Sequence, residues 1–517
     1  MFSHMREIGR SIGRRAKAGS MLETLEKRTM MSAAPTTAQL QQAAQDAYIY
    51  GLAPLVFQNG EHTATFNKLN NLSTFPGPGT GVAPNADTLY STAYLNLAKE
   101  PIVLHQANTN GRYVLFQLLD AFADTFNSLG SETTGTQAQN YLIAGPNWVG
   151  PVPAGTELVR SPTNNVWVIG RTQTLDTPAD IAAVNALQAQ YSLTPLNVFL
   201  NPNATPPATP ASPATVTLSN AQSFYTGLAA FLRTTPPPAA DGPILKEFAE
   251  FGLGPADQFS WSKLSTSVQQ ALTTGFSQGQ SRFTADVNSG SAIYGPPSFT
   301  ANGWNFALAN IGTYGTDYDA RAVIEVYGPG ANPPADAVYP GTSVDVNGNT
   351  LNGANNNYDL HFAANQIPPA NAFWSVTVYQ NSQFYANSIN RYSTGSLHPE
   401  LQFNSDGSLD IYLQNTQPAS GTSNWLPIPA GAFKVTLRIY WPQESVLDGN
   451  YIPPGILASP VPSSLAHSAS RLATPAAEIG AVAQSNLPTD GSSTTQSFLA
   501  SSSDVLDKAK YAAIFAK

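Results

Sequence analysis

Turn-forming residues are the sequence feature that most restricts how this chain can fold. Its 517 residues include 41 prolines and 39 glycines. Proline lacks a backbone N–H donor and glycine favours turns, so this content argues against long coiled coils and predicts many turns and short strands. Hydrophobic residues make up 42% of the chain, which is enough to build cores. At about 100–200 residues per domain, the length predicts roughly three folding units.

The charge and the absence of cysteine exclude several classes of function. Charged residues make up only 11% of the chain, against about 25% in an average soluble domain. The net charge of −9 argues against a nucleic-acid partner, and no apolar run is long enough for a transmembrane helix. Without cysteine there are no disulfides, thiolate metal sites or thiol nucleophiles. Neither a metal-binding histidine spacing nor a nucleotide-binding glycine loop occurs, so we expect no metal and no cofactor.

Residues 1–36 resemble an addressing segment rather than part of the fold. The first 33 residues hold seven basic and three acidic side chains, which suggests export, although the usual apolar stretch is missing. The piece LEKRTMMSA (25–33) resembles leaders common on large secreted planctomycete proteins. The alternatives are a disordered basic tail or a misassigned start codon. Low charge and abundant Ser, Thr and Asn elsewhere also suit an extracytoplasmic or secreted protein, which is the location that we expect.

Periodicity divides the remaining chain into regions. Apolar residues recur at helical spacing in 37–58, whereas β-rich runs and turn clusters follow. Helical patterns return after residue 177, and strands return from 300 onward. We therefore expect a mainly β fold with a helical insert (α+β). Its expected regions are a leader (1–36), a β-sandwich with an N-terminal helix (37–172), a helical middle region (173–299), a jelly-roll-like β-sandwich (300–457) and a Ser/Ala/Thr-rich tail with a short terminal helix (458–517).

Sequence blocks spread over about residues 40–457 resemble a known pair of domains. The blocks are NADTLYS (85–91), GRY (111–113), QLLD (117–120), TTGT (133–136), VIGRT (168–172), GW (303–304), YDARA (318–322), NPPADAVY (332–339), AFWSVTVY (372–379), NWLP (424–427) and LRIYWP (437–442). In this order they resemble the paired DUF1254 and DUF1214 domains. The resemblance implies an N-terminal β-sandwich, a helical middle and a C-terminal jelly-roll-like β-domain, and it brings no settled activity.

Two residues depart from the pattern of these domains. Glu132 stands where an arginine often precedes the TTGT block, and Asn96 stands where an aspartate is common. If those charges serve a ligand site, this chain is altered there.

The densest polar cluster of the first expected sandwich contains Asn85, Asp87, Tyr90, Arg112 and Asp120. Asp87 and Asp120 are a candidate catalytic acid/base pair if they face each other, and Arg112 can hold a carboxylate or phosphate through two hydrogen bonds. Asn85 and Tyr90 are candidate ligand-binding residues. The alternative is purely structural, since Asp–Arg pairs and Asx turns often hold strands and loops together.

Candidate ligand-binding residues of the second β-region are Tyr318, Arg321, Trp425 and Arg438. Aromatic side chains and arginines can line a cleft, but aromatics at alternate strand positions also build cores. The arginines are harder to assign to a core, because an arginine among apolar residues needs a partner.

Two other motifs favour local structural interpretations. GFSQG (275–279) matches the nucleophile-elbow pattern, but the preceding residues predict a helix rather than the strand that this elbow requires, so Ser277 is expected at a helix end. The segment 345–350 partly matches a calcium loop, but it lacks the required glycine and glutamate. Its Asn-Gly pair favours a hairpin turn instead.

Two hypotheses for function remain open at this point. The first is an exported ligand-binding or envelope-associated protein, with a small molecule or a cell-surface polymer as its partner. The alternative is a secreted hydrolase with Asp87 and Asp120 as acid and base and Arg112 or Arg321 orienting an anion. The absence of a specific catalytic motif favours binding, and the fold class does not decide because β-sandwiches serve both. One pocket shared by Asp87, Arg112 and Arg321 would favour the enzyme.

Overall fold

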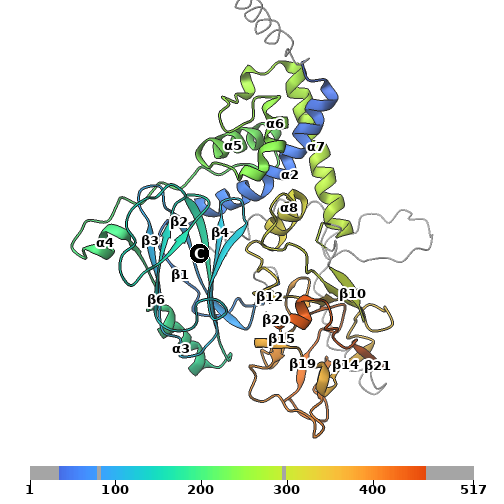
Figure 1. The fold of residues 1–517 in the computed structure, drawn as a ribbon. Coiled ribbons are helices and arrows are strands. Elements are labelled where there is room, and N and C mark those ends of the chain that lie inside the picture. Colours follow the sequence, from blue (N-terminus) through green and yellow to red (C-terminus); the bar gives the residue numbers. More distant parts are fainter. Residues whose placement is uncertain (1–33, 79–82, 291, 294–297, 461–517) are drawn as a thin grey trace, which may run out of the picture.

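The computed structural model describes residues 34–78, 83–290, 292–293 and 298–460. Helices gather at one end of the molecule, and two β-domains lie beneath them on either side, with helix α8 between (Figure 1). This arrangement confirms the expected fold class, with sheets in the N- and C-terminal regions and a helical middle. The predicted leader before residue 34, and the predicted tail with its helix after residue 460, lie outside the described residues.

The first β-domain is a sandwich of two sheets. Its five-stranded sheet has the order β1-β2-β8-β4-β5 and its four-stranded sheet the order β7-β6-β3-β9. Apolar side chains such as Leu104, Phe116 and Val168 fill the space between the sheets. The strands are β1 (Asn70–Asn71), β2 (Thr88–Asn96), β3 (Ile102–Gln106), β4 (Val114–Asp120), β5 (Thr125–Gly130), β6 (Gln139–Ala144), β7 (Glu157–Arg160), β8 (Asn165–Gln173) and β9 (Ser192–Pro195). The sandwich therefore extends beyond residue 172, through helix α3 (Pro178–Gln188) to β9.

Strand β4 is buried along its whole length, which explains its continuous apolar sequence. One face of the strand, including Phe116, packs into the sandwich core. On the other face Leu115 contacts the second β-domain, whereas Leu119 contacts the helical body. The outer face of this sheet is therefore the surface on which the other two parts of the molecule meet.

Helix α2 is the centre of the helical body rather than an appendage of the first sandwich. It is buried on most sides by its neighbours, so it carries apolar residues all round instead of along one stripe. The helices and short 3-10 turns are α2 (Thr37–His62), α4 (Leu196–Leu200), α5 (Ala221–Thr234), η1 (Ala239–Asp241), α6 (Gly242–Ala249), η2 (Trp261–Lys263), α7 (Thr266–Ser289) and α8 (Tyr318–Tyr327).

The GFSQG motif serves helix packing. Ser277 lies inside α7 rather than at its end, and its hydroxyl donates to the Thr273 carbonyl at 3.2 Å. A Cβ atom on Gly275 would come within 2.3 Å of the Gln41 carbonyl oxygen, and one on Gly279 within 2.8 Å of Tyr48. The two glycines therefore allow α2 and α7 to approach closely, and the motif is not a nucleophile elbow.

The second β-domain also consists of two facing sheets, with Trp304, Leu360 and Leu437 in the core between them. Its long central pair is β15 and β20, which run antiparallel. The elements are β10 (Phe299–Ala301), β11 (Trp304–Phe306), β12 (Ala337–Val338), β13 (Gly341–Thr342), β14 (Asn356–Phe362), η3 (Ala364–Gln366), β15 (Ala370–Gln380), β16 (Gln383–Phe384), β17 (Ser393–Gly395), β18 (Leu409–Gln414), β19 (Trp425–Pro427), β20 (Lys434–Pro442), α9 (Glu444–Leu447) and β21 (Leu457–Pro460).

Two smaller expectations concern this part of the chain and the helices. The segment 345–350 forms the expected hairpin turn, because Asp345 accepts backbone N–H bonds from Asn347 (2.8 Å) and Asn349 (2.9 Å) and Val344 pairs with Thr350. None of the helices within the described residues is both long and apolar enough to span a membrane.

Candidate functional site at the domain junction

The two β-domains meet where the outer face of the β2-β8-β4 sheet contacts β15 and β20. Aromatic rings form the apolar part of this junction. The ring of Tyr113 meets Phe373 and Tyr440 edge-on, with centroids 5.6 and 5.9 Å apart, and Phe373 stacks on Tyr440 at 4.4 Å. Edge-to-face pairs of this kind contribute specific geometry as well as buried area. The apolar contact therefore fixes how the polar side chains around it are placed.

Asn85 and Asp87 connect the two domains by hydrogen bonds. The Asn85 side-chain oxygen accepts from the backbone N–H of Asp87 at 2.5 Å, which is an Asx turn, while its amide donates to the Tyr440 hydroxyl at 2.6 Å. The Asp87 carboxylate accepts hydrogen bonds from the hydroxyls of Ser375 (2.7 Å) and Ser393 (3.4 Å). Both side chains are buried, so their place in the junction is fixed by partners from the second domain.

Arg438, in β20 of the second β-domain, also links the two domains. It is 4% exposed, and it donates to the Thr377 hydroxyl at 2.6 Å, to the Pro84 carbonyl at 3.1 Å and to the Tyr379 hydroxyl. These acceptors satisfy the requirement that a buried arginine finds partners. The link to Pro84 again crosses from one domain to the other.

Arg171, in β8, is the second buried arginine of the junction. It is 5% exposed and donates to Gln117 Oε1 at 2.7 Å and to the Gly330 carbonyl at 3.0 Å, while its Nε has no hydrogen-bond partner. Its guanidinium lies 5.4 Å from the centre of the Tyr90 ring. Both acceptors are neutral, and within the described residues no ion pair involves Arg171. This guanidinium therefore carries a buried charge that acts on Asp336 without forming an ion pair with it.

Tyrosine hydroxyls surround the two arginines. Tyr90, Tyr339 and Tyr440 are electrostatic neighbours of Arg171, and Tyr339 donates to Asn332 Oδ1 at 2.7 Å. Tyr90 and Tyr339 remain partly exposed, although their surroundings are buried. Burial raises the pKa of Tyr339 to about 12, so its hydroxyl stays protonated and can donate. We define the junction site as Tyr90, Arg171, Tyr339, Arg438 and Tyr440.

The junction site is chemically a set of hydrogen-bond donors. Guanidinium groups carry only donors and remain charged at every pH that a protein experiences, and a phenol hydroxyl donates or accepts. The aromatic faces add apolar contact area. Such an arrangement suits a ligand that combines acceptor oxygens and negative charge with an apolar body.

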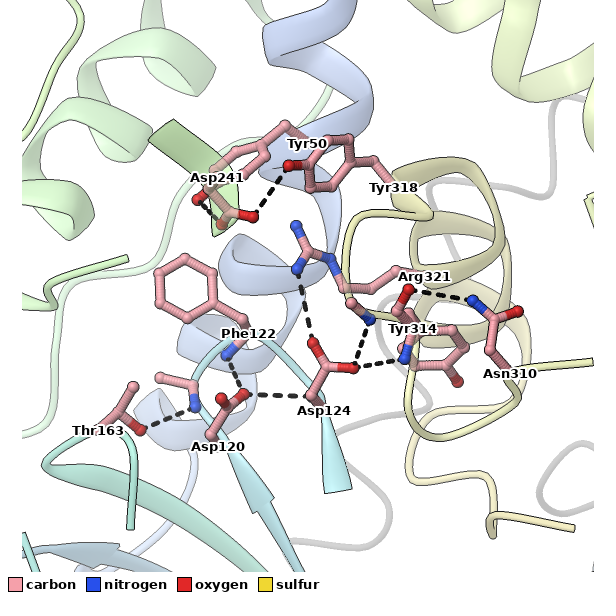
Figure 2. Close-up of polar contacts among 12 residues, drawn as sticks. Tyr50, Asp120, Phe122, Asp124, Thr163, Asp241, Asn310, Tyr314, Tyr318 and Arg321 are labelled. Atoms are coloured by element: carbon pink, nitrogen blue, oxygen red, sulfur yellow. Dashed lines mark hydrogen bonds and ion pairs between the residues drawn. The ribbon is translucent and has the colours of Figure 1, made fainter. Parts of the chain in front are cut away.

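A second arginine-centred cluster lies where the first sandwich, α2 and α8 meet (Figure 2). Arg321 of α8 is fully buried, and its guanidinium carbon lies 5.0 Å from the centre of the Tyr318 ring, 5.1 Å from that of Tyr50 and 5.9 Å from that of Phe122. Its Nη1 is 3.7 Å from Asp124 Oδ2, which makes an ion pair. We call these five side chains the Arg321 box.

Two further carboxyl groups border the Arg321 box. Asp241 accepts hydrogen bonds from the hydroxyls of Tyr50 and Tyr318, each at 2.9 Å. Asp120 accepts the backbone N–H groups of Phe122 (2.8 Å) and Asp124 (3.2 Å). Burial, followed by the charge of Asp124, raises the pKa of Asp120 to about 7. The box therefore joins three parts of the chain through one arginine and the carboxyl groups around it.

Two family descriptions match the chain, one on each side of the domain junction. Residues 66–195 match the family described as a protein of unknown function, DUF1254, and residues 336–444 match the corresponding DUF1214 family. The chain is a DUF1254/DUF1214 domain-containing protein. The DUF1254 match ends at β9, in agreement with the structural limit of the first sandwich. The junction site takes Tyr90 and Arg171 from the DUF1254 domain and its other three residues from the DUF1214 domain.

One solved structure supports the fold. The VPA0106 protein from Vibrio parahaemolyticus is 24% identical, with a TM-score of 0.65, and the similarity covers 81% of this chain and 100% of that one. A putative uncharacterized protein from Burkholderia cenocepacia is 13% identical over 82% and 95% of the two chains, with a TM-score of 0.39. No curated protein matches the chain. The comparisons therefore give architecture and family but no activity.

Asp87 and Asp120 lie at opposite ends of the DUF1254 sheet. Thr88 pairs with Gln173 of β8, whereas Asp120 pairs with Val166, seven residues away on the same strand. At about 3.3 Å per residue, this separates the two ends by about 23 Å. The condition for an acid/base pair, that the two carboxyl groups face each other, is therefore not met. Asp87 instead belongs to the junction and Asp120 borders the Arg321 box.

Arg112 and Trp425 are placed away from both clusters. Arg112 binds the Asp180 carboxylate through two hydrogen bonds of 2.5 and 2.9 Å at the start of α3, which is the structural alternative. Trp425 donates to the Gln414 carbonyl at 2.9 Å and lines a cavity of about 400 Å³ on the other sheet of the DUF1214 domain. Asp87, Arg112 and Arg321 consequently share no pocket.

Sequence reasoning selected Tyr90 and Arg438 of the junction site but missed Arg171. The signal was present, since Arg171 follows the apolar run Val166–Gly170 within a buried strand. The argument that selected Arg321 and Arg438, that an arginine among apolar residues needs a partner, applies to it equally. Tyr339 and Tyr440 were visible only as parts of the sequence blocks of the DUF1214 domain.

Proposed function

We propose that this protein is an extracytoplasmic binding protein that takes up a small organic anion at the junction between its DUF1254 and DUF1214 domains. The observation that carries the proposal is the buried guanidinium of Arg171, whose hydrogen-bond acceptors are both neutral. Burying a charge is costly unless it is paired, so a site of this kind favours an anionic ligand. The expected location rests on the basic leader and on the low charge of the chain.

The proposed ligand carries a carboxylate and an apolar body. Its carboxylate oxygens accept from Arg171 Nε, which has no hydrogen-bond partner, and its apolar body lies beside the Tyr90 ring that faces the same guanidinium. Hydrogen bonds to charged groups are roughly twice as strong as neutral ones, so this contact supplies most of the specificity. The aromatic rings of the junction contact the apolar part. A small molecule suits this place better than a polymer, because most of the surrounding side chains are buried.

The hydrolase alternative has weaker support. The acid and base that it requires are about 23 Å apart along the sheet. The carboxylate of Asp87 is already held by two serine hydroxyls of the DUF1214 domain. A binding protein needs neither group to react.

The test is ligand binding by the whole protein, measured by calorimetry with benzoate, citrate and inorganic phosphate as probes. We expect at least one carboxylate to bind, and Arg171→Gln to weaken that binding at least tenfold, which corresponds to about 1.4 kcal/mol. Tyr339→Phe removes the hydroxyl that donates to Asn332 and keeps the ring, so it tests whether this neighbour of Arg171 helps to position the ligand. Arg233→Gln, at an exposed position on α5, is the control. Absence of binding to all three probes, or equal binding by wild type and Arg171→Gln, contradicts the proposal.

A further inference from the structure

Two carboxyl groups meet across the domain junction, next to the junction site but not part of it. Glu132 lies in the β5–β6 turn of the DUF1254 domain, and Asp336 lies at the start of the DUF1214 domain. The two side chains are hydrogen-bonded to each other. Tyr113 donates to Glu132 Oε1 at 2.7 Å, and Ser128 donates to Asp336 Oδ2 at 2.6 Å. Asp336 is 3% exposed, whereas Glu132 is half-buried.

A hydrogen bond between two carboxyl groups requires a proton on one of them. An ionised carboxylate only accepts, so two ionised groups at this distance repel each other. Burial, and after it the charge of Asp336, raises the pKa of Glu132 to about 9. Hydrogen bonds from Ser128 and Glu132 counteract the effect of burial on the pKa of Asp336. Glu132 is therefore the group that carries the proton at neutral pH.

The elements packed against the Glu132–Asp336 pair contribute neutral side chains and one cation. Tyr113 at the start of β4 and Ser128 in β5 are neutral donors, and Asn332 after α8 is a neutral amide near Asp336. Arg171 of β8 is the cation whose charge acts on Asp336, and Tyr440 of β20 is an electrostatic neighbour of Tyr113. One cation is thus available to the pair, which balances one carboxylate but not two.

We propose that Glu132 and Asp336 form a proton-operated latch that closes the DUF1254–DUF1214 junction and releases it when the shared proton is lost. Among the other polar links across the junction, Asn85–Tyr440 joins neutral groups and Arg438–Pro84 joins a permanent cation to a carbonyl. The Asp87 carboxylate accepts from two serine hydroxyls, so none of these links brings two carboxyl groups together. Loss of the shared proton therefore changes the Glu132–Asp336 contact from an attraction into a repulsion. The inference needs no ligand and stands apart from the proposed binding function.

The direction of the pH effect follows from proton linkage. The closed junction holds a proton up to about pH 9, whereas a separated, solvated Glu132 loses it near its ordinary pKa of about 4.3. Closing therefore takes up one proton between these limits. The ratio of closed to open molecules falls up to tenfold for each pH unit in this window, and it falls no further once the pair is fully ionised.

The test measures the distance between the two domains as a function of pH. The chain contains no cysteine, so Val149→Cys in the DUF1254 domain and Phe403→Cys in the DUF1214 domain place two spin labels uniquely, at positions 95% and 51% exposed. We expect one narrow distance distribution at pH 6 and a longer, broader one at pH 10. Glu132→Gln keeps a hydrogen-bond donor that cannot ionise, so it is expected to stay narrow at both pH values.

Controls make each outcome decisive. Glu250→Gln, at an exposed helix end, should follow the wild type. Asp336→Asn replaces Glu132→Gln if the latter fails to fold, with the same expected loss of pH response. The latch is overturned if the wild-type distribution is unchanged at pH 10. It is also overturned if Glu132→Gln and Asp336→Asn open at pH 10 as much as the wild type does. Opening that occurs only together with loss of the helical circular dichroism signal also overturns it, because it reports general unfolding.

Discussion

The junction site and the Arg321 box are both built around buried arginines, but Arg171 of the junction site and Arg321 are balanced differently. Arg321 lies against three aromatic rings and forms an ion pair with Asp124. Arg171 lies against one ring and donates to two neutral oxygens. Arg321 has its counter-charge, Asp124, within ion-pair distance, whereas Asp336, the carboxylate on which the charge of Arg171 acts, makes no ion pair with it. This difference in ion pairing, rather than burial alone, is our reason for proposing Arg171 and not Arg321 as a ligand-binding arginine.

Replacing each arginine by methionine should give the largest difference between the two regions. Arg321→Met leaves the half-buried Asp124 without its cation, which costs about 3 kcal/mol of unfolding free energy, the lower end for breaking a buried pair because Asp124 is 20% exposed. Arg171→Met removes a charge that has no bound anion and leaves only neutral acceptors unpaired, at a cost of about 1–3 kcal/mol. Chemical denaturation with urea measures both values.

Equal destabilisation by Arg321→Met and Arg171→Met would contradict the difference that we assign to the two arginines. Arg233→Met is the matched control, because Arg233 is exposed and surface changes of this kind usually alter stability by less than about 0.5 kcal/mol. A larger cost for Arg171→Met than for Arg321→Met would exchange the roles that we assign to the two sites.

Asp120, which borders the Arg321 box, is expected to make the stability of the protein depend on pH. Its pKa is raised by burial to about 7 in the folded chain, against about 3.9 when unfolded. The folded state therefore holds a proton that the unfolded state releases, and the stability from this group is present below pH 4 and lost as pH rises through 7. The expected loss is about 1.4 kcal/mol per pH unit in this window.

Asp120→Asn should remove that part of the pH dependence. Asparagine resembles the protonated acid, and the single oxygen that accepts from Phe122 and Asp124 is retained. Urea denaturation at pH 5 and pH 7.5 gives the change, and the difference between wild type and variant separates Asp120 from other buried acids such as Glu61. Parallel pH profiles for the two proteins would show that Asp120 is ionised throughout.

The two regions also show what the sequence can predict. The run 112–119 and the turn clusters around it predicted the first sandwich, because burial and strand periodicity are local properties. The partners of Asp87 and Asp120 were not predictable in the same way. Strands β2 and β4 both run antiparallel to β8, so a residue before one and a residue at the end of the other lie at opposite ends. Nothing local reveals that β8 lies between them.

The buried arginines illustrate the same limit. Arg321 and Arg438 were selected because charge among apolar residues requires a partner, which is a rule that needs no structure. The partners themselves are distant in sequence, since Asn85 reaches Tyr440 355 residues later and Tyr318 reaches Asp241 77 residues earlier. Those pairings depend on how the domains and helices pack, so the sequence identified the residues but not the two groups into which they assemble.

The smallest expected effect concerns the neutral hydrogen bonds of the junction. Tyr440→Phe removes the hydroxyl that accepts from the Asn85 amide and keeps the ring that stacks on Phe373. Loss of one neutral hydrogen bond costs about 0.5–1.5 kcal/mol, because the amide retains its bond to the Thr88 hydroxyl at 3.0 Å. Urea denaturation measures the cost, and Tyr451→Phe, a tyrosine outside the junction that donates to the Gln366 carbonyl, is the matched control. If the proposed ligand contacts the Tyr440 hydroxyl, the loss in affinity should exceed that of the control, whereas a loss in stability alone would make Tyr440 a purely structural member of the junction site.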